Sequence, residues 1–118
     1  MAMKDSFRRG PGRASLAPAA ALFRSLGDPA RLAIVRRLAE GEARVVDLTG
    51  ELGLAQSTVS AHLACLRDCG LITVRAVGRA SVYSLAQPAL AGLLAAAEDL
   101  LAATGNKVAL CPAHGRAG

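Results

Sequence analysis

The chain is poor in aromatic residues, which make up 3% of its 118 residues. Alanine and leucine dominate instead, and these residues have high intrinsic preferences for the α-helix. With 53% hydrophobic and 19% charged residues, the chain has enough apolar surface to fold around a core. We therefore expect a mainly helical protein of one domain, in which a second copy completes a core of small aliphatic side chains.

Long apolar runs are also missing. No uncharged stretch of about 18 apolar residues occurs, so no segment is expected to span a membrane. The basic residues near the N-terminus are not followed by an apolar stretch, which argues against a secretory signal. These absences predict a cytoplasmic protein. Three cysteines, an odd number in a reducing compartment, are then free thiols, ligands or redox groups rather than a disulfide framework.

The sequence lacks the residue combinations of common enzymes. The only two histidines, His62 and His114, are far apart, and no Ser/His/Asp set, carboxylate pair or phosphate-binding glycine loop occurs. We therefore expect no enzyme. The formal net charge of +5 indicates a polyanionic partner instead, although residues 16–118 carry only about +2 of it.

Three segments are expected along the chain. Residues 1–15 are basic and contain a Gly-Pro-Gly sequence, which favours a flexible arm. Residues 16–103 carry the periodic apolar pattern of a folded domain. Residues 104–118 form a C-terminal tail that contains Cys111.

Within the domain, apolar spacing and capping residues predict five helices. Asp28 and Pro29 mark the start of the second one, as its N-cap and its first helical residue. The third and fourth helices are joined by a short turn that contains Gly53, as in a helix-turn-helix. The expected helices cover about residues 16–26, 29–40, 45–52, 56–69 and 88–103.

A β-hairpin is expected after the fourth helix, from two strand-like runs around Gly78-Arg79 at residues 71–77 and 80–85. Such a wing completes a winged helix-turn-helix, in which the N-terminal part of the second helix of the motif enters the major groove. Polar side chains there can bond to base edges or phosphates. The predicted DNA contacts are Gln56, Ser57, Thr58, Ser60, His62, Arg75 and Arg79. The alternative is that these residues only cap and solvate the helix and the hairpin.

Cys65 and Cys69 lie four residues apart near the end of this same helix, so their side chains share one face. Thiolates favour soft metal ions, and Cys111 in the tail is the third thiol. Three sulfur atoms suit a trigonal ion, or a tetrahedral ion completed by oxygen or nitrogen, for which His114 is a candidate. The alternative is that the helical cysteines pack as small apolar side chains.

Three pieces of the sequence carry a family resemblance. They are Asp28-Pro29-Ala30-Arg31, the SxxVSxHLxxLxxxGL run from Ser57 to Leu71, and the Gly78-Arg79 wing with Tyr83. Together they resemble the ArsR/SmtB family of metal-sensing repressors over about residues 16–103. The resemblance implies a homodimer, formed through the first and last helices. It also implies that the dimer binds an inverted repeat in double-stranded operator DNA when metal-free and releases it when the inducer binds.

The position of the cysteines narrows the resemblance. A Cys-x-Cys pair found in some family members is replaced here by Arg44-Val45-Val46-Asp47, and the last helix has no histidine. What remains resembles the CmtR-type cadmium and lead sensors. In these, two cysteines of the recognition helix, matching Cys65 and Cys69, combine with a tail cysteine of the partner subunit, matching Cys111. The implied inducer is Cd(II) or Pb(II), with Zn(II) or As(III) as alternatives. A thiol-redox sensor on the same fold and a metal-buffering protein that binds DNA only incidentally also stay open.

Overall fold

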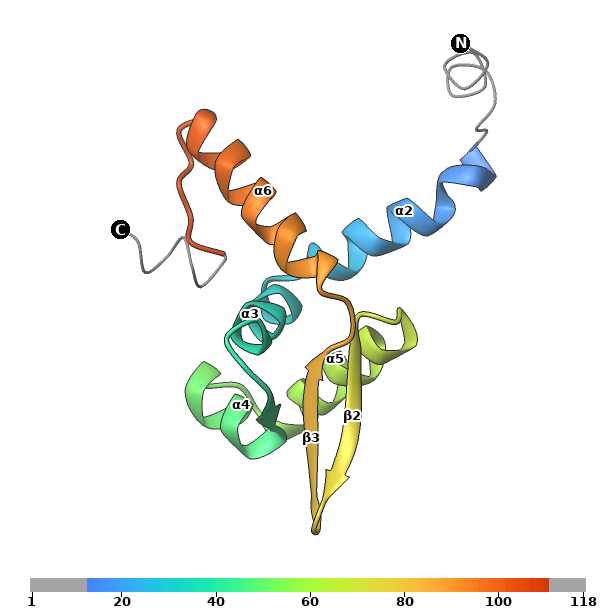
Figure 1. Cartoon of the computed structure of the whole chain (residues 1–118), viewed down its shortest axis with the longest axis vertical. Helices are drawn as coiled ribbons and strands as arrows, with labels where there is room; N and C mark the ends of the chain where they lie inside the picture. The colour runs from blue at the N-terminus through green and yellow to red at the C-terminus, as the bar shows by residue number, and fades with distance from the viewer. Residues whose placement is uncertain (1–12, 111–118) are drawn as a thin grey trace.

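The computed structural model describes residues 13–110 (Figure 1). Residues 1–12 and 111–118, and with them the predicted ligand Cys111 and its neighbour His114, lie outside the described residues. The elements in chain order are α2 (Arg13–Leu26), α3 (Pro29–Leu38), β1 (Ala43–Arg44), α4 (Val45–Leu52), α5 (Gln56–Asp68), β2 (Ile72–Val77), β3 (Ala80–Leu85) and α6 (Ala89–Ala103). The predicted mainly helical fold with a β-hairpin wing is confirmed.

The helix boundaries follow local capping chemistry. Asp28 is the N-cap of α3, and its side chain accepts a hydrogen bond of 3.0 Å from the backbone N–H of Arg31. Gly53 ends α4 with a φ of 67°, a left-handed conformation that glycine adopts without steric cost. Helix α2 begins at Arg13, so it includes the last residues of the segment that the sequence assigned to the basic arm.

The sheet has three antiparallel strands in the order β1-β3-β2. The hairpin of β2 and β3 was predicted, with Gly78 and Arg79 at its turn. Strand β1 was not predicted, because two residues are too few to show a period of two. It pairs with β3 through Ala43 opposite Tyr83 and Arg44 opposite Val82, and thereby joins the start of α4 to the wing.

Aliphatic side chains from α3, α4 and α5 form the centre of the core. The fully buried ones are Ile34, Val35, Leu48, Val59, Leu63 and Leu66. Val59, Leu63 and Leu66 follow one face of α5, as their spacing predicted, so the opposite face of this helix is directed outward. Leu110, beyond α6, also joins this core with only 6% of its surface exposed.

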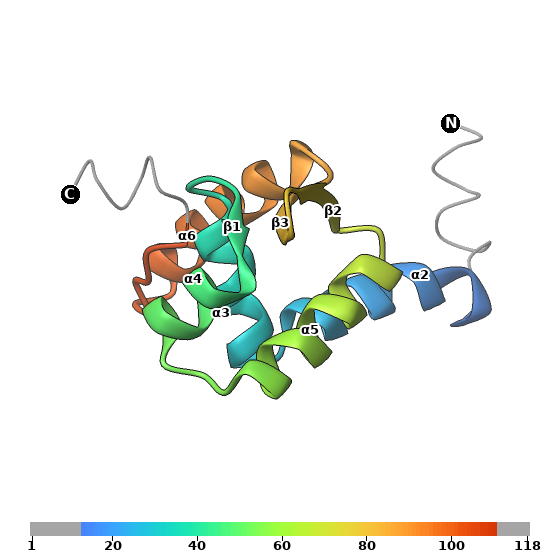
Figure 2. The ribbon, with the colours of Figure 1, turned by 90° about the horizontal axis from the view of Figure 1, so that it is seen from below.

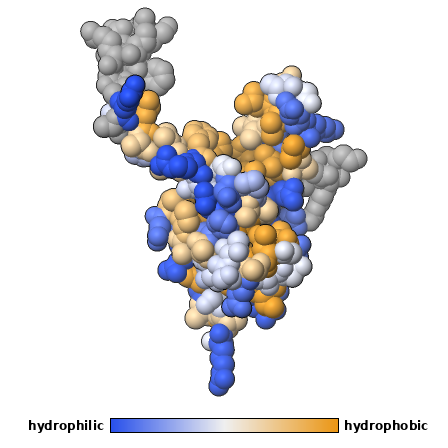
Figure 3. All heavy atoms as spheres, turned by 180° about the vertical axis from the view of Figure 1, so that it is seen from behind, coloured by the Kyte–Doolittle hydropathy of each residue, from blue (hydrophilic) through white to orange (hydrophobic). Residues whose placement is uncertain are grey.

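Helices α2 and α6 extend away from the body like two arms (Figures 1 and 2). Large apolar side chains on both arms face solvent: Leu16 and Phe23 on α2 are 52% and 60% exposed, and Leu100 on α6 is 66% exposed. Figure 3 shows hydrophobic atoms along α6 and where the arms meet. The single chain thus leaves apolar surface on its arms uncovered. Among residues 13–110, no helix is long and apolar enough to cross a membrane.

Candidate DNA-binding surface and thiol site

The first turns of α5 carry exposed polar side chains. Gln56, Ser57 and Ser60 are exposed and Thr58 is half-buried, whereas Val59 between them is fully buried. The N-cap of this helix is Ala55, whose side chain makes no capping hydrogen bond. The polar side chains of the first turn therefore do not serve as its N-cap, and they lie on the outer surface where a ligand can meet them.

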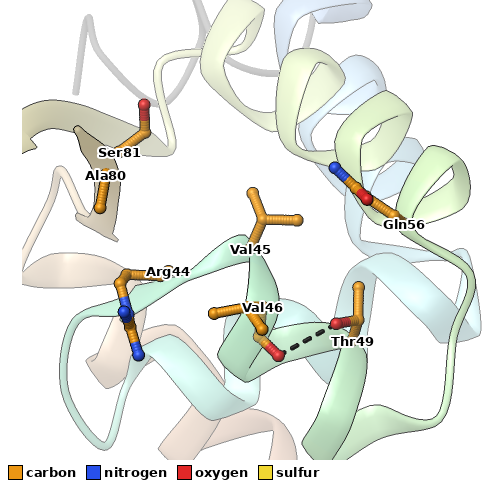
Figure 4. A pocket seen from close by; sticks show the side chains of 7 residues that line it. All are labelled: Arg44, Val45, Val46, Thr49, Gln56, Ala80 and Ser81. Atoms are coloured by element: carbon orange, nitrogen blue, oxygen red, sulfur yellow. Dashed lines mark hydrogen bonds between the residues drawn. The ribbon is translucent and has the colours of Figure 1, made fainter.

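A groove of about 370 Å³ separates this end of α5 from the wing (Figure 4). Gln56 of α5 points into the same space that Ser81 of β3 borders, and the remaining lining comes from β1, α4 and the start of β3. The lining residues are Arg44, Val45, Val46, Thr49, Gln56, Ala80 and Ser81. Sequence reasoning did not propose Arg44 or Thr49 as part of this surface. The only signal was that Arg44 directly precedes a short helix.

Charged groups at the groove are arranged around the start of α4. The Arg44 guanidinium lies 3.3 Å from the Asp47 carboxylate, and the Arg44 backbone N–H donates a hydrogen bond of 3.0 Å to the same side chain. The backbone hydrogen bond, then the side-chain hydrogen bond, hold the pKa of Asp47 below its ordinary value. These contacts with Asp47 fix the position of Arg44, which lines the groove.

The two arginines of the wing differ in their surroundings. Arg75 is exposed, but its Nη2 lies 2.6 Å from Oε1 of Glu42, so this charge already has an acidic partner. Arg79 is exposed at the tip of the hairpin, in the turn between β2 and β3. Of the two predicted wing contacts, Arg79 is thus the one whose position on the wing favours a phosphate.

His62 lies apart from the other predicted DNA contacts. Its side chain is 19% exposed, with Nε2 3.6 Å from Oδ2 of Asp28 and Nδ1 3.5 Å from Nη1 of Arg31. The Arg31 backbone N–H, followed by the charges of His62 and Arg31, holds the pKa of Asp28 below its ordinary value. The imidazole ring of His62 thus lies against the start of α3 and links α5 to α3.

Arg31 links the start of α3 to the C-terminal end of α2. Its Nε donates a hydrogen bond of 2.7 Å to the carbonyl oxygen of Ser25, and its Nη2 donates one of 3.2 Å to that of Arg24. Both carbonyls lie in the last turn of α2, where the helix itself offers them no hydrogen-bond donor. One guanidinium thus holds the end of α2, the start of α3 and the middle of α5 together.

The two helical cysteines lie at the other end of α5. Both are free thiols; Cys65 is half-buried, and Cys69 is exposed and forms the C-cap. The Cys69 sulfur lies 3.0 Å from the hydroxyl oxygen of Ser25, a residue that is only 5% exposed. Among residues 13–110, no three His, Cys, Asp or Glu side chains are grouped so as to hold a metal ion. Among the described residues, this end of α5 thus carries two soft donors one helical turn apart.

The fold defines a class of protein, the winged helix-turn-helix, which is typical of DNA-binding regulators. The family model described as "Bacterial regulatory protein, arsR family" matches residues 28–74, from the N-cap of α3 into β2. The chain also matches an HTH-type transcriptional regulator of Mycobacterium tuberculosis, Rv0081, with 39% identity over 84 residues, 70% of this chain and 74% of that protein. The chain belongs to the ArsR family.

Other relatives include proteins named for metals. A probable mercury resistance operon repressor of Streptomyces lividans is 37% identical over 83 residues, which are 70% of this chain and 66% of that protein. The regulator CmtR of Mycobacterium tuberculosis is 44% identical over 75 residues, 64% of each chain. The matches thus span about two thirds of the length of these relatives.

Two solved structures support the fold. The crystal structure of Rv0081 superposes with a TM-score of 0.73 at 35% identity, covering 80% of this chain and 94% of that one. The NMR structure of CmtR, described as a cadmium metal-sensor, gives 0.57 at 43% identity, covering 65% of this chain and 80% of that one. Both agree with the winged helix-turn-helix described above.

Proposed function

We propose that this chain is a metal-responsive transcriptional repressor. As a homodimer it binds an inverted-repeat operator when metal-free, and Cd(II) or Pb(II) bound by Cys65, Cys69 and Cys111 releases it. The observation that carries the proposal is the arrangement of α5, which has exposed polar side chains at its first turn and two free thiols at its other end. A metal bound at one end of a rigid helix can change how the other end is presented to DNA.

The exposed apolar side chains of the arms support the homodimer. Leu16 and Phe23 on α2 and Leu100 on α6 would be covered if the two arms pack against those of a second copy. A two-fold axis between the copies would present two α5 helices to successive major grooves, which requires an inverted repeat in the DNA.

The donor chemistry fits a soft ion. Thiolates favour Cd(II), Pb(II) and related ions over harder ones, and such an ion would supply bonds that join separate chain segments at the end of α5. The C-terminal end of α5 and the described end of the tail lie on opposite sides of α3 (Figures 1 and 2). This separation favours a site in which Cys111 of each tail completes the pair Cys65 and Cys69 of the partner subunit.

The chain's own contacts suggest how binding is transmitted. A thiol must lose its proton to become a ligand, so the contact between Cys69 and Ser25 changes when the site fills. Ser25 belongs to α2, and Arg31 links the same end of α2 to α3 and, near His62, to α5. Allosteric coupling of about 1–3 kcal/mol is typical, and about 1.4 kcal/mol already lowers operator affinity tenfold.

A titration with two readings tests the proposal. Cd(II) is added to the dimer while sulfur-to-metal charge-transfer absorbance and operator binding are followed in parallel, in wild type and in Cys65→Ser, Cys69→Ser and Cys111→Ser. We expect each variant to bind operator without metal, to lose the wild-type spectrum and to resist release. The proposal fails if any one of the three variants keeps both the spectrum and metal-induced release.

The same assay separates the other candidates. Pb(II), Zn(II), As(III) and Hg(II) are titrated in turn, the last because one relative is a probable mercury resistance repressor. Release by peroxide without metal would favour a thiol-redox sensor, although a disulfide within one helical turn departs from preferred geometry. Metal binding that is indifferent to DNA, with no preferred DNA sequence, would instead indicate a metal-buffering protein.

A further inference from the structure

Helix α6 carries a buried acid that the DNA-binding surface and the helical thiols do not use. Glu98 is 6% exposed although it lies on an otherwise alanine- and leucine-rich helix. Its carboxylate oxygen Oε2 accepts a hydrogen bond from the backbone N–H of Leu110, twelve residues later. Burying a carboxylate costs free energy unless hydrogen bonds compensate it, so Glu98 requires a specific reason to occupy this position.

The segment that Glu98 contacts is held at two further points. The Leu110 side chain is 6% exposed and packs in the core with the side chains of the domain. Arg36 of α3 donates a hydrogen bond of 3.3 Å from Nη1 to the carbonyl oxygen of Ala109. The chain therefore turns back after α6 and returns toward α3, as Figure 1 shows.

We propose that Glu98 is a positioning residue that latches the tail at Leu110. The latch comprises the Glu98 carboxylate, the Leu110 backbone N–H and side chain, and the Arg36 contact to Ala109. Leu110 immediately precedes Cys111 in the sequence, so the latch fixes the backbone next to the third thiol. The role in metal binding rests on the proposed function, but the latch itself does not.

The latch matters for metal affinity because ordering a free tail costs conformational entropy. Fixing the backbone of each residue costs conformational entropy, and a chain already held at residue 110 leaves fewer residues to order when Cys111 binds. Glu98 thus acts on the metal site without touching the metal. A conservative change that keeps the oxygen acceptor should preserve this effect, and an apolar change should remove it.

The test uses full-length dimer and three variants. Glu98→Leu removes the acceptor, Glu98→Gln keeps an oxygen acceptor without the charge, and Asp99→Asn alters the exposed acid next to it as the control. Amide hydrogen exchange at Leu110 is measured by NMR without metal, and Cd(II) affinity by competition with a chelator. In Glu98→Leu we expect the Leu110 amide hydrogen to exchange at least about tenfold faster and the affinity for Cd(II) to fall about tenfold. Both effects follow from loss of the buried hydrogen bond between Glu98 and Leu110. Glu98→Gln and Asp99→Asn should remain near wild type.

A fourth variant distinguishes loss of the latch from a folding defect in α6. Leu110→Ala loosens the tail from its own side and leaves α6 unchanged, and it should reproduce both effects while far-UV circular dichroism and the dimer mass stay constant. Unchanged Leu110 exchange in Glu98→Leu would overturn the latch. Faster exchange with unaltered Cd(II) affinity in both Glu98→Leu and Leu110→Ala would overturn its role at the metal site. Cys111→Ser measured beside them reports separately on the third ligand, so failure of the latch and failure of the proposed function are distinguishable.

Discussion

The two ends of α5 differ in how they are attached to the rest of the protein. At the N-terminal end, Gln56 and Ser57 are exposed beside an open groove. Further along, His62 lies against Asp28 and Arg31, and Cys69 meets the buried hydroxyl of Ser25. The N-terminal end is thus free to meet a ligand, whereas the helix from His62 onward, the tied end, contacts α3 and α2.

This difference indicates how a signal would travel. Because Val59, Leu63 and Leu66 are fully or almost fully buried, α5 cannot bend easily and should move as one body. A change at its tied end would then reorient its free end, and the arm α2 would be affected at the same time through Ser25. Substitutions at the free end should therefore change operator affinity without changing metal binding. Substitutions at the tied end should change the factor by which bound metal weakens operator binding.

The largest expected effect is at the free end. Gln56→Ala combined with Ser57→Ala should lower operator affinity by at least about 30-fold, because each good contact to a base edge contributes about 1–3 kcal/mol and the variant dimer loses at least two of them. The Cd(II) charge-transfer spectrum should be unchanged. Operator binding by fluorescence anisotropy and the metal spectrum are measured on the same samples. A large change in the metal spectrum would break the separation of the two ends.

A smaller effect is expected from the wing. Arg79→Ala should reduce the slope of log K against log salt concentration by about 1.8, because the variant dimer loses one phosphate contact from each of its two wings and each contact contributes about 0.9. Arg75→Ala should reduce it less, because Glu42 already neutralises this side chain at 2.6 Å. Glu42→Gln is the matched control and should raise the contribution of Arg75. Equal slopes for the two arginine variants would contradict the distinction between them.

The secondary structure was easier to predict from sequence than the contacts of the tied end. The start of α3 at Asp28, the buried face of α5 and the hairpin around Gly78 depend on neighbours within a few residues, so their patterns are visible in the sequence. Strand β1 was missed because its two residues are defined only by pairing with β3, about forty residues later.

The contacts of the tied end depend on tertiary packing. Ser25 and Cys69 are 44 residues apart, and nothing in either residue's local sequence indicates that α2 and α5 meet there. His62 was grouped with the DNA contacts because it shares a helix with them, whereas the fold directs its ring toward α3. The thiol pair itself was visible from its spacing of four. Its hydroxyl neighbour was not, and the latch at Glu98 was likewise invisible before α6 and Leu110 were seen together.

The contact between Ser25 and Cys69 gives the next effect in size. Ser25→Ala removes the hydroxyl beside the Cys69 sulfur. Operator affinity without metal should stay near wild type. The factor by which Cd(II) weakens operator binding should change, by less than about tenfold. Loss of the buried hydrogen bond should also lower the free energy of unfolding by about 1 kcal/mol. Ser15→Ala on the exposed part of α2 is the control. Identical coupling in Ser25→Ala and Ser15→Ala would show that the hydroxyl plays no part in transmission.

The smallest effect concerns the cap where α3 meets α5. The Arg31 backbone N–H, with the charges of His62 and Arg31, lowers the pKa of Asp28 from its usual 3.8. A carboxyl with a lowered pKa in the folded state stabilises the fold above its unfolded pKa, and this contribution is lost as pH falls through the folded value. Asp28→Asn keeps an oxygen that can cap the helix but has no titrating charge. Wild type should therefore lose more stability than Asp28→Asn when urea unfolding is followed from pH 5 into the acid range below about 3.8.

Asp47 at the start of α4 offers the matched comparison, because hydrogen bonds from Arg44 lower its pKa in the same direction. Asp47→Asn should flatten the acid dependence of stability as Asp28→Asn does, since both carboxylates cap a helix. Only Asp28 faces a side chain of α5, so only Asp28→Asn should also alter the coupling between Cd(II) and operator at neutral pH. If both variants alter that coupling equally, α5 is held no more firmly at His62 than at its N-terminal end, and the contrast between its two ends is lost.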